Sequence, residues 1–209
     1  LTAAYLLRKH QPVVLEQAAR FGGNARGESW RGMDYAIGAA YFTAPDEGSP
    51  LAALYAELGV DRLWRRKPEG HPVALDGRLV EDFWRGETVP VAQRRQFRDL
   101  AGYFHRLYNE EGGLRYPQIP AATAAERAHV DALDRSSFRR HVEARLDGRR
   151  LHPHIRTAFE HYCWSSFGAS FSEVGAAAGL NFFAAEFGEI LVTLGGNAAI
   201  AERLHERLG

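Results

Sequence analysis

The sequence contains a single cysteine, Cys163, among its 209 residues. One thiol can neither close an internal disulfide nor form a thiolate metal site, so both are excluded. This cysteine usage fits a reducing compartment, and we expect a cytoplasmic protein. The most apolar region, Gly175–Phe187, is interrupted by Asn181 and Glu186 and is shorter than the roughly 18 apolar residues that a membrane span requires. We therefore expect no transmembrane segment.

The chain also lacks net charge, because 26 Lys and Arg residues balance 26 Asp and Glu residues. Without a basic surplus, nucleic acid is not expected as a partner. A hydrophobic content of 45% and a charged content of 25% are ordinary for a globular protein. A chain of this length can form one large domain or two small ones, and it can bury a substantial core.

No recognised metal or nucleophile motif is present either. His154 and His161 would share a helix face, but no carboxylate completes a spacing such as HExxH. Cys163 and His161 are two residues apart and would point away from each other on a helix. We therefore expect no metal and a buried structural thiol, and we assign no catalytic residue. Aromatic residues late in the chain are expected to form core rather than a substrate cavity: Tyr162, Trp164, Phe167, Phe182 and Phe183.

The stretch Val13–Gly27 carries the clearest functional pattern. Val13–Leu15 is too short for a helix and typical of a strand that is covered on both faces. Glu16 follows where such a strand would leave its sheet, the position at which an acid binds ribose hydroxyls in dinucleotide-binding units. Gly22 and Gly23 then predict a turn whose backbone can approach a pyrophosphate closely. Either feature by itself is uninformative, and their spacing is what predicts a nucleotide site.

The residues before this stretch fit the same unit. The acid of such a unit lies roughly 20 residues past the start of a glycine-rich phosphate loop, with a helix between them. Leu1–Leu7 is apolar and free of Pro and Gly, which predicts that helix. No glycine loop precedes Leu1 in the sequence. We therefore expect an N-terminal portion of a longer protein that lacks its phosphate loop.

Four stretches, LTAAYLL, VVLE, RFGGNARG and YAIGAAYF, resemble the opening of the flavin-containing amine oxidases, whose relatives are the phytoene desaturases and protoporphyrinogen oxidases. Gly195–Gly209 is similar to the Gly-Gly-plus-helix stretch by which these chains return to the cofactor domain. The resemblance implies FAD, held by Glu16 and the Gly-Gly turn, with Gly38 and Ala39 beside the flavin ring. The chain by itself is then expected to be inactive and to bind little or no flavin.

Two positions depart from the family pattern. The family carries an arginine directly after the Gly-Gly pair, where Asn24 stands, and another two residues past the acid, where Ala18 stands. Both arginines lie near the ribose and phosphates of the cofactor, and Arg20 and Arg26 are the nearest substitutes. The resemblance thus implies this cofactor-binding set: Glu16, Arg20, Gly22, Gly23, Asn24, Arg26, Gly38 and Ala39.

Local signals predict several further elements. Ser49–Gly59 has a capping serine, a proline at the first helical position and a terminal glycine, which predicts a helix. Arg62–Lys67, followed by Pro68, is interpreted as a linker between domains. Pro72–Val80 predicts a hairpin around Asp76-Gly77, and because one hairpin is only marginally stable it is expected to join a larger sheet.

The remainder is predicted to be mostly helical. Capping-box patterns at Thr123–Glu126 and Ser170–Glu173 are expected to open helices that run to Leu133 and Phe187. Three more helices are predicted from apolar stripes, Pro and Gly: Val91–Asn109, Phe138–Leu146 and Pro153–Phe167.

Together these patterns predict an α/β fold class. By its content of helices and strands the chain is α+β and rich in helix. Residues 1–60 form a partial Rossmann-like FAD-binding domain, residues 61–188 a mainly helical substrate-domain insertion with a small hairpin, and residues 189–209 return to the FAD-binding domain. The resemblance implies an FAD-dependent oxidoreductase that removes a hydride from an amine or related small-molecule substrate. Two alternatives remain: a carotenoid desaturase-like or protoporphyrinogen oxidase-like enzyme with a longer apolar substrate, and a non-enzymatic helical interaction module with a vestigial nucleotide-binding edge.

Overall fold

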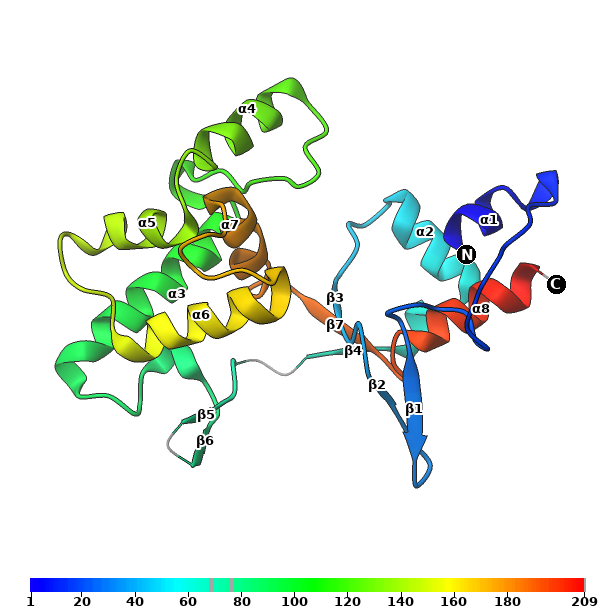
Figure 1. Ribbon diagram of the computed structural model, residues 1–209, viewed down its shortest axis with the longest axis horizontal. Helices are drawn as coiled ribbons and strands as arrows, with labels where there is room; N and C mark the ends of the chain where they lie inside the picture. The colour runs from blue at the N-terminus through cyan, green and yellow to red at the C-terminus, as the bar shows by residue number, and fades with distance from the viewer. Residues whose placement is uncertain (68–69, 76, 209) are drawn as a thin grey trace. The chain divides into compact units, whose positions relative to one another are not determined.

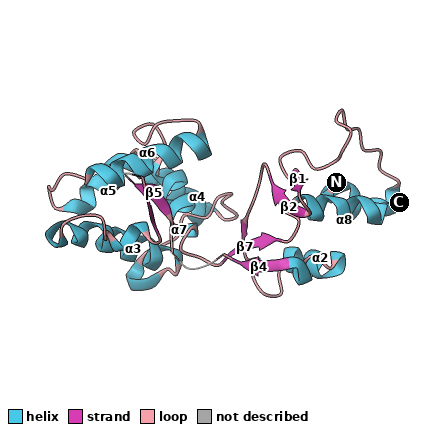
Figure 2. Cartoon of the chain, turned by 90° about the horizontal axis from the view of Figure 1, so that it is seen from below, coloured by secondary structure: helices cyan, strands magenta, loops and turns pink. Residues whose placement is uncertain are grey.

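The computed structural model describes residues 1–67, 70–75 and 77–208. The chain forms two compact units. Unit 1 comprises Leu1–Pro68 and Glu189–Gly209, and unit 2 comprises Glu69–Gly188. Unit 1 is therefore built from both ends of the chain, and helices are the dominant element of unit 2 (Figure 2). No helix in the described ranges is both long and apolar enough to cross a membrane.

Unit 1 is organised around a small antiparallel sheet. Its central strand β7 (Ile190–Thr193) pairs with β3 (Phe42–Thr43) on one side and with β4 (Trp64–Arg66) on the other. The late strand thus ties two early segments of the chain together. The other elements of the unit are α1 (Thr2–Leu6), η1 (Arg8–His10), β1 (Gly27–Trp30), β2 (Met33–Ala36), α2 (Pro50–Leu58), η2 (Asp61–Leu63) and α8 (Ala198–Leu208) (Figure 1).

The helix α2 forms as its sequence predicts. The Ser49 side chain accepts a hydrogen bond from Ala52 N–H at 3.2 Å, Pro50 occupies the first helical position, and Gly59 ends the helix with φ 69°. Leu58 is buried and packs with Tyr5 of α1 and Leu204 of α8. The start, the end and the buried face of α2 are all confirmed.

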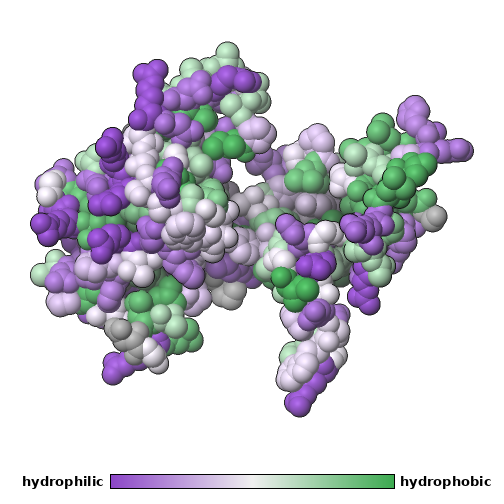
Figure 3. All heavy atoms as spheres, in the orientation of Figure 1, coloured by the Kyte–Doolittle hydropathy of each residue, from purple (hydrophilic) through white to green (hydrophobic). Residues whose placement is uncertain are grey.

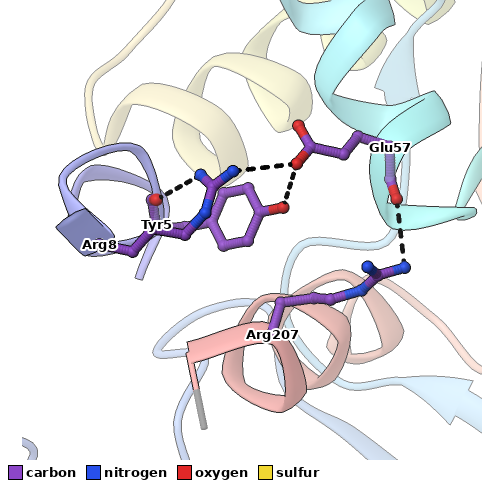
Figure 4. Close-up of polar contacts among 4 residues, drawn as sticks. All are labelled: Tyr5, Arg8, Glu57 and Arg207. Carbon is purple, nitrogen blue, oxygen red and sulfur yellow. Dashed lines mark hydrogen bonds and ion pairs between the residues drawn. The ribbon is translucent and has the colours of Figure 1, made fainter.

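Polar contacts to Glu57 link α2 both to the N-terminal segment and to α8 (Figure 4). The Tyr5 hydroxyl donates to Glu57 Oε1 at 2.5 Å, and Arg8 Nη2 donates to the same oxygen at 3.2 Å. Arg207 Nη2 on α8 donates to the Glu57 carbonyl at 3.4 Å. The hydrogen bond to Glu57 raises the pKa of Tyr5 above its ordinary value. A helix as short as α1 is not stable by itself, so these contacts and its packing hold it in place.

The predicted strand at Val13–Leu15 is wrong. These residues are irregular, and Val13 and Leu15 are 84% and 91% exposed. An apolar run becomes a buried strand only where neighbouring strands pair with it, and none of the sheets formed by the described residues includes this segment. Figure 3 shows apolar surface in the part of unit 1 that carries the chain termini.

The predicted linker or domain crossing, Arg62–Lys67 with Pro68 and Gly70, contains the boundary between the units but is wrong over residues 64–66. Residues 64–66 form β4, in which Trp64 lies opposite Thr193 of β7. Val60 is fully buried in the core of unit 1. The observed boundary between the units therefore falls after β4, because a distant strand turns this charged segment into sheet. Pro68, which belonged to the same prediction, lies outside the described residues.

Unit 2 is a bundle of helices around an aromatic core. Phe104, Phe138 and Phe159 are fully buried, and their rings contact one another at centroid distances of 5.3 to 6.4 Å. The elements of the unit are β5 (Val73–Leu75), β6 (Arg78–Val80), η3 (Phe83–Arg85), η4 (Val91–Gln93), α3 (Arg94–Tyr108), η5 (Glu111–Gly113), α4 (Ala124–Leu133), α5 (Phe138–Glu143), η6 (Ala144–Leu146), α6 (Pro153–Phe167) and α7 (Ala176–Ala185).

Most local predictions in unit 2 are confirmed. The capping box of α4 is complete, since Thr123 Oγ1 accepts from Glu126 N–H at 3.2 Å and Glu126 accepts from Thr123 N–H at 2.8 Å. The helix α6 has the predicted bounds. The predicted helix over 91–109 appears as η4 followed by α3, and the one over 138–146 as α5 followed by η6.

The predicted start of α7 is wrong by several residues. Ser170–Glu173 forms a turn in which Glu173 accepts from Ser170 N–H at 3.0 Å, but the helix begins at Ala176. Its cap comes from α4's end, where Asp134 Oδ1 accepts from Ala177 N–H at 2.8 Å. A side chain added at Gly175 would meet this oxygen at 2.5 Å. The helix thus starts where a distant carboxylate can satisfy its free N–H groups.

The hairpin of β5 and β6 is confirmed, with Val73 opposite Val80 and Leu75 opposite Arg78. Asp76 of its predicted turn lies outside the described residues. The expectation that the hairpin joins a larger sheet is wrong, because within the described part of the chain it forms a sheet of two strands. Val73 and Leu75 instead pack on the helical core, which supplies the stabilising contact that more strands would otherwise provide.

Candidate functional site

A cavity of about 500 Å³ lies in unit 1. Its wall combines the start of α1, the segment from Val14 to Ala25, one residue each of β3 and α2, and one side of α8. The volume lies within the range of about 300 to 1,000 Å³ that small-molecule sites occupy. The lining residues are Leu1, Thr2, Val14, Leu15, Glu16, Phe21, Gly22, Gly23, Ala25, Phe42, Tyr55, Asn197, Ile200, Ala201 and Leu204.

Three predicted site residues share this wall, namely Glu16, Gly22 and Gly23. The Glu16 carboxylate is oriented by a local bond, because its Oε1 accepts from Ala18 N–H at 2.9 Å. Gly22 and Gly23 adopt φ values of 128° and 56°, so the turn that they form requires positive φ at both positions. A Cβ on Gly22 would lie 3.3 Å from Ala201 of α8, whereas Gly23 has no neighbour within 4 Å. The turn therefore packs closely on α8 through its first glycine and is open at its second.

Other lining residues come from distant parts of the sequence and are not among the predicted site residues. Asn197 is buried at the start of α8, and its Oδ1 accepts from Thr193 Oγ1 at 3.2 Å. Phe42 and Tyr55 form an aromatic part of the wall, with ring centroids 5.7 Å apart. Asn197 directly follows the glycine pair at 195 and 196, and this position was the one sequence signal that pointed toward it.

Arg20 and Arg26 line a second cavity of unit 1, which has a volume of about 540 Å³. Glu28 and Glu202 also line this cavity, so its wall contains acidic side chains as well as the two arginines. The Phe21 ring is tilted against the ring of His205 on α8, with centroids 4.7 Å apart, and Phe21 lines both this cavity and the first one. The structure therefore divides five of the eight predicted binding residues between two cavities.

Asn24, Gly38 and Ala39 are in neither lining and instead contact one another. The Asn24 carbonyl accepts from Ala39 N–H at 2.6 Å. A Cβ on Gly38 would meet that same carbonyl oxygen at 2.0 Å. Gly38 is therefore needed for close backbone packing against the glycine turn, and this contact ties residues 38–39 to the loop that carries the predicted site.

Burial shifts the pKa of two groups in unit 2 far from their ordinary values. Burial raises the pKa of the Cys163 thiol to about 12, which keeps it protonated and unreactive. Burial and the nearby Arg145 lower the pKa of His141 to about 4. Within the described ranges, no three His, Cys, Asp or Glu side chains are grouped as a metal site.

A third cavity, of about 30 Å³, lies in the core of unit 2. It is lined mainly by aromatic rings, and its wall also contains a histidine and a carboxylate. The lining residues are His71, Val73, Phe83, Trp84, Ala158, Phe159, Tyr162, Phe183, Glu186 and Phe187. Five late aromatic residues were expected to be core. Tyr162, Phe182 and Phe183 pack with the core cluster, but the expectation is wrong for Trp164 and Phe167, which are 55% and 37% exposed.

Comparison with known proteins places the fold. Residues 1–58 match the family of NAD(P)-binding Rossmann-like domains. The structure of wild-type putrescine oxidase bound to putrescine aligns with 99% of this chain and 46% of that one, with a TM-score of 0.62 at 18% identity. A double mutant of putrescine oxidase with redesigned cofactor binding gives the same values. No curated protein matches the chain in sequence.

These matches confirm the predicted fold class, a helix-rich α/β chain with a Rossmann-like part. They also support the resemblance to the flavin amine oxidases at the level of fold. The chain spans 46% of the putrescine oxidase chain, less than half of it.

Proposed function

We propose that this chain, which has the fold of putrescine oxidase, belongs to an FAD-dependent oxidoreductase that removes a hydride from an amine or a related small molecule. Unit 1 would hold the nucleotide and unit 2 would contribute to the substrate side. The proposal extends the fold likeness to a reaction, and it is supported by the residues that unit 1 brings together.

The observation that carries the proposal is the shared wall of Glu16, Gly22 and Gly23 in the first cavity. A carboxylate is the acceptor that binds ribose hydroxyls, and a glycine turn is the backbone that a pyrophosphate can approach. Both occur within residues 1–58, the part of the chain that matches a nucleotide-binding family. The residues present therefore fit the adenosine side of FAD.

The roles of the chain's own residues follow from this arrangement. Glu16 would accept hydrogen bonds from the ribose, held in orientation by Ala18 N–H. Gly23, which is open on its Cβ side, would admit the phosphates to the backbone. Phe42 and Tyr55 would exclude water from the apolar part of the cavity. Bound flavin supplies hydride-accepting chemistry, and the protein supplies binding, orientation and exclusion of water.

The arginines contribute to the proposal in a different way. Arg20 and Arg26 line the neighbouring cavity, together with Glu28 and Glu202. We therefore propose them as outer electrostatic partners of the nucleotide loop, and Gly38 as the residue that packs residues 38–39 against Asn24. In this arrangement Asn24 acts through its backbone carbonyl, which accepts from Ala39 N–H.

The small size of the cavity in the aromatic core of unit 2 favours a small substrate over a long apolar one. A carotenoid-like substrate needs a long apolar channel, whereas the cavity in the aromatic core has a volume of about 30 Å³. We therefore place the desaturase alternative second. The non-enzymatic alternative, a helical interaction module, predicts that the protein carries no flavin.

The experiment that tests the proposal is a visible absorption spectrum of the protein expressed from its complete gene. The proposal predicts a bound flavin band, reduced in Glu16→Ala because the ribose loses its acceptor. Glu47→Ala is the matched control, since Glu47 is an exposed acid of unit 1 outside the cavity lining and is expected to leave the flavin content unchanged. A colourless, correctly folded wild-type protein would support the interaction module instead.

A further inference from the structure

A hollow on the surface of unit 2 has a wall of polar and charged side chains. Its volume is about 470 Å³, and it is formed by α5 and its cap together with the turn that precedes α7 (Figure 1). The described residues of this wall include no apolar side chain and no aromatic ring, so the hollow suits a hydrophilic ligand. The lining residues are Ser137, Arg139, Arg140, Glu143 and Ser172.

The part of the chain that forms the hollow is locally basic, although the protein as a whole carries no net charge. Residues 135–156 contain seven arginines and two acidic residues. Within the hollow, Arg139 and Glu143 offset each other, because Arg139 Nε donates to Glu143 Oε1 at 2.8 Å. The charge that remains is positive and belongs to Arg140.

The Arg140 side chain is available to a ligand. It is exposed, and it forms no ion pair or hydrogen bond with the residues that the structure describes. The neighbouring Arg145 differs, because its guanidinium lies over the Tyr103 ring at 3.9 Å and donates to His141 Nε2 at 3.2 Å. Arg140 is therefore a cation without a partner within the described residues, at the edge of a hollow that it lines.

The side chains of the hollow supply mainly hydrogen-bond donors. A guanidinium has several N–H donors and no acceptor, and Arg139 keeps its Nη groups when its Nε is bound to Glu143. Ser137 Oγ accepts from Arg140 N–H at 3.4 Å, which leaves its hydroxyl hydrogen free to donate. Such a set of donors matches a group with several negatively charged oxygens. A phosphate group is of this kind, and the arginine fork binds it through two parallel hydrogen bonds.

We propose that this hollow binds a phosphate group, as the free ion or as a small hydrophilic monoester, with Arg140 as its main counter-charge and Arg139 and Ser137 as further donors. The volume of about 470 Å³ lies within the range of about 300 to 1,000 Å³ for small-molecule sites, which leaves room for the rest of a monoester. All of its residues belong to unit 2, and none lines the cavities of unit 1. The proposal therefore does not rest on the proposed function.

Calorimetric titration of the chain with inorganic phosphate, in an organic buffer at constant ionic strength, tests this proposal. Saturable binding is expected, and methyl phosphate is expected to bind as well, whereas methanol is not. Binding of inorganic phosphate without binding of methyl phosphate would identify the free ion as the ligand. Absence of binding by both phosphates would overturn the proposal. The titration needs no flavin, so its result is separate from that of the absorption spectrum.

Substitutions in the hollow are expected to change the affinity in opposite directions. Arg140→Gln removes the free positive charge, so we expect phosphate binding about tenfold weaker. Glu143→Gln removes the negative charge and releases Arg139, so we expect binding about threefold tighter. Arg127→Gln is the matched control, because Arg127 is an exposed arginine of unit 2 outside the wall of the hollow. Circular dichroism confirms that each variant is folded.

Three results for these variants would each overturn the proposal. The first is undiminished phosphate binding by Arg140→Gln, and the second is weaker binding by Glu143→Gln. The third is an equal loss in Arg127→Gln, which would show nonspecific attraction between phosphate and surface arginines.

Discussion

The two units differ in how they use their apolar residues. In unit 2, Phe104, Phe138 and Phe159 are fully buried in one continuous aromatic core. In unit 1, Val13 and Leu15 are 84% and 91% exposed, although their sequence is as apolar as that of a buried strand. Unit 2 therefore buries its aromatic core among its own helices, although Leu79 and Trp164 remain exposed, whereas unit 1 leaves a whole apolar run on the surface beside two open cavities. An apolar run is buried only where another helix or strand packs against it, and the hydrophobicity of the run does not ensure that one is there.

The largest expected effect comes from removing a core ring of unit 2. Phe104→Ala deletes a fully buried side chain, and we expect it to lower the free energy of unfolding by about 3–5 kcal/mol. Leu15→Ala, in the exposed segment of unit 1, is expected to change it by less than about 0.5 kcal/mol. Urea unfolding monitored by near-UV circular dichroism measures both. Similar losses for the two variants would remove the contrast between the units.

Two helical glycines of unit 2 differ in how tightly the surrounding side chains pack around them. A Cβ on Gly179 would meet the Phe138 ring at 2.3 Å, so Gly179→Ala is expected to destabilise by about 1–3 kcal/mol. A Cβ on Gly102 would meet only the flexible end of Arg106 at 3.2 Å, so Gly102→Ala is expected to stabilise by up to about 1 kcal/mol through helix propensity. The change from Gly to Ala is therefore expected to lower stability at one position and to raise it at the other. Thermal unfolding that shows a change in the same direction for both variants would contradict this expectation.

Two helix starts differ in whether their N–H groups are bound by a neighbouring residue or by one far away in the sequence, and substitutions compare how much each contributes to stability. Asp134→Ala removes the acceptor of Ala177 N–H at the start of α7, with an expected loss of about 2 kcal/mol because a backbone donor is left without its partner. Thr123→Ala removes the local cap of α4, with an expected loss of about 1 kcal/mol. Hydrogen exchange at each helix start distinguishes the two. A smaller loss for Asp134→Ala would show that α7 starts independently of α4.

The smallest expected effect is a difference in pH response. The pKa of His141 in unit 2 is lowered to about 4, so the folded state resists protonation, and stability falls as the pH decreases from about 6.5 toward 4. The pKa of Tyr5 in unit 1 is raised, so stability falls as the pH rises above about 10. His141→Gln and Tyr5→Phe should each flatten one limb of the stability profile and leave the other unchanged.

Sequence reasoning was accurate wherever the partner of a residue lies within a few positions. Ser49 caps the helix that begins at the next residue, and Thr123 and Glu126 exchange bonds across three residues. It failed where the partner is distant. The pattern at Ser170–Glu173 produced a turn, and α7 starts beside Asp134 instead. The charged segment 64–66 became a strand because β7, more than a hundred residues later, pairs with it.

The candidate site likewise contains residues that could be predicted from one stretch of sequence and residues that could not. Glu16, Gly22 and Gly23 were predicted from one stretch, and they line one cavity. Phe42, Tyr55 and Asn197 complete its wall, but none of them was predicted as a site residue.

The sequence by itself determined the capped helices and the residue types of a nucleotide loop, because capping bonds and glycine turns are satisfied locally. Only the tertiary structure decided that Val13–Leu15 stays exposed and that α8 closes the cavity beside the glycine turn. Strand pairing and cavity walls need groups from distant parts of the chain, and the folded backbone alone brings these together.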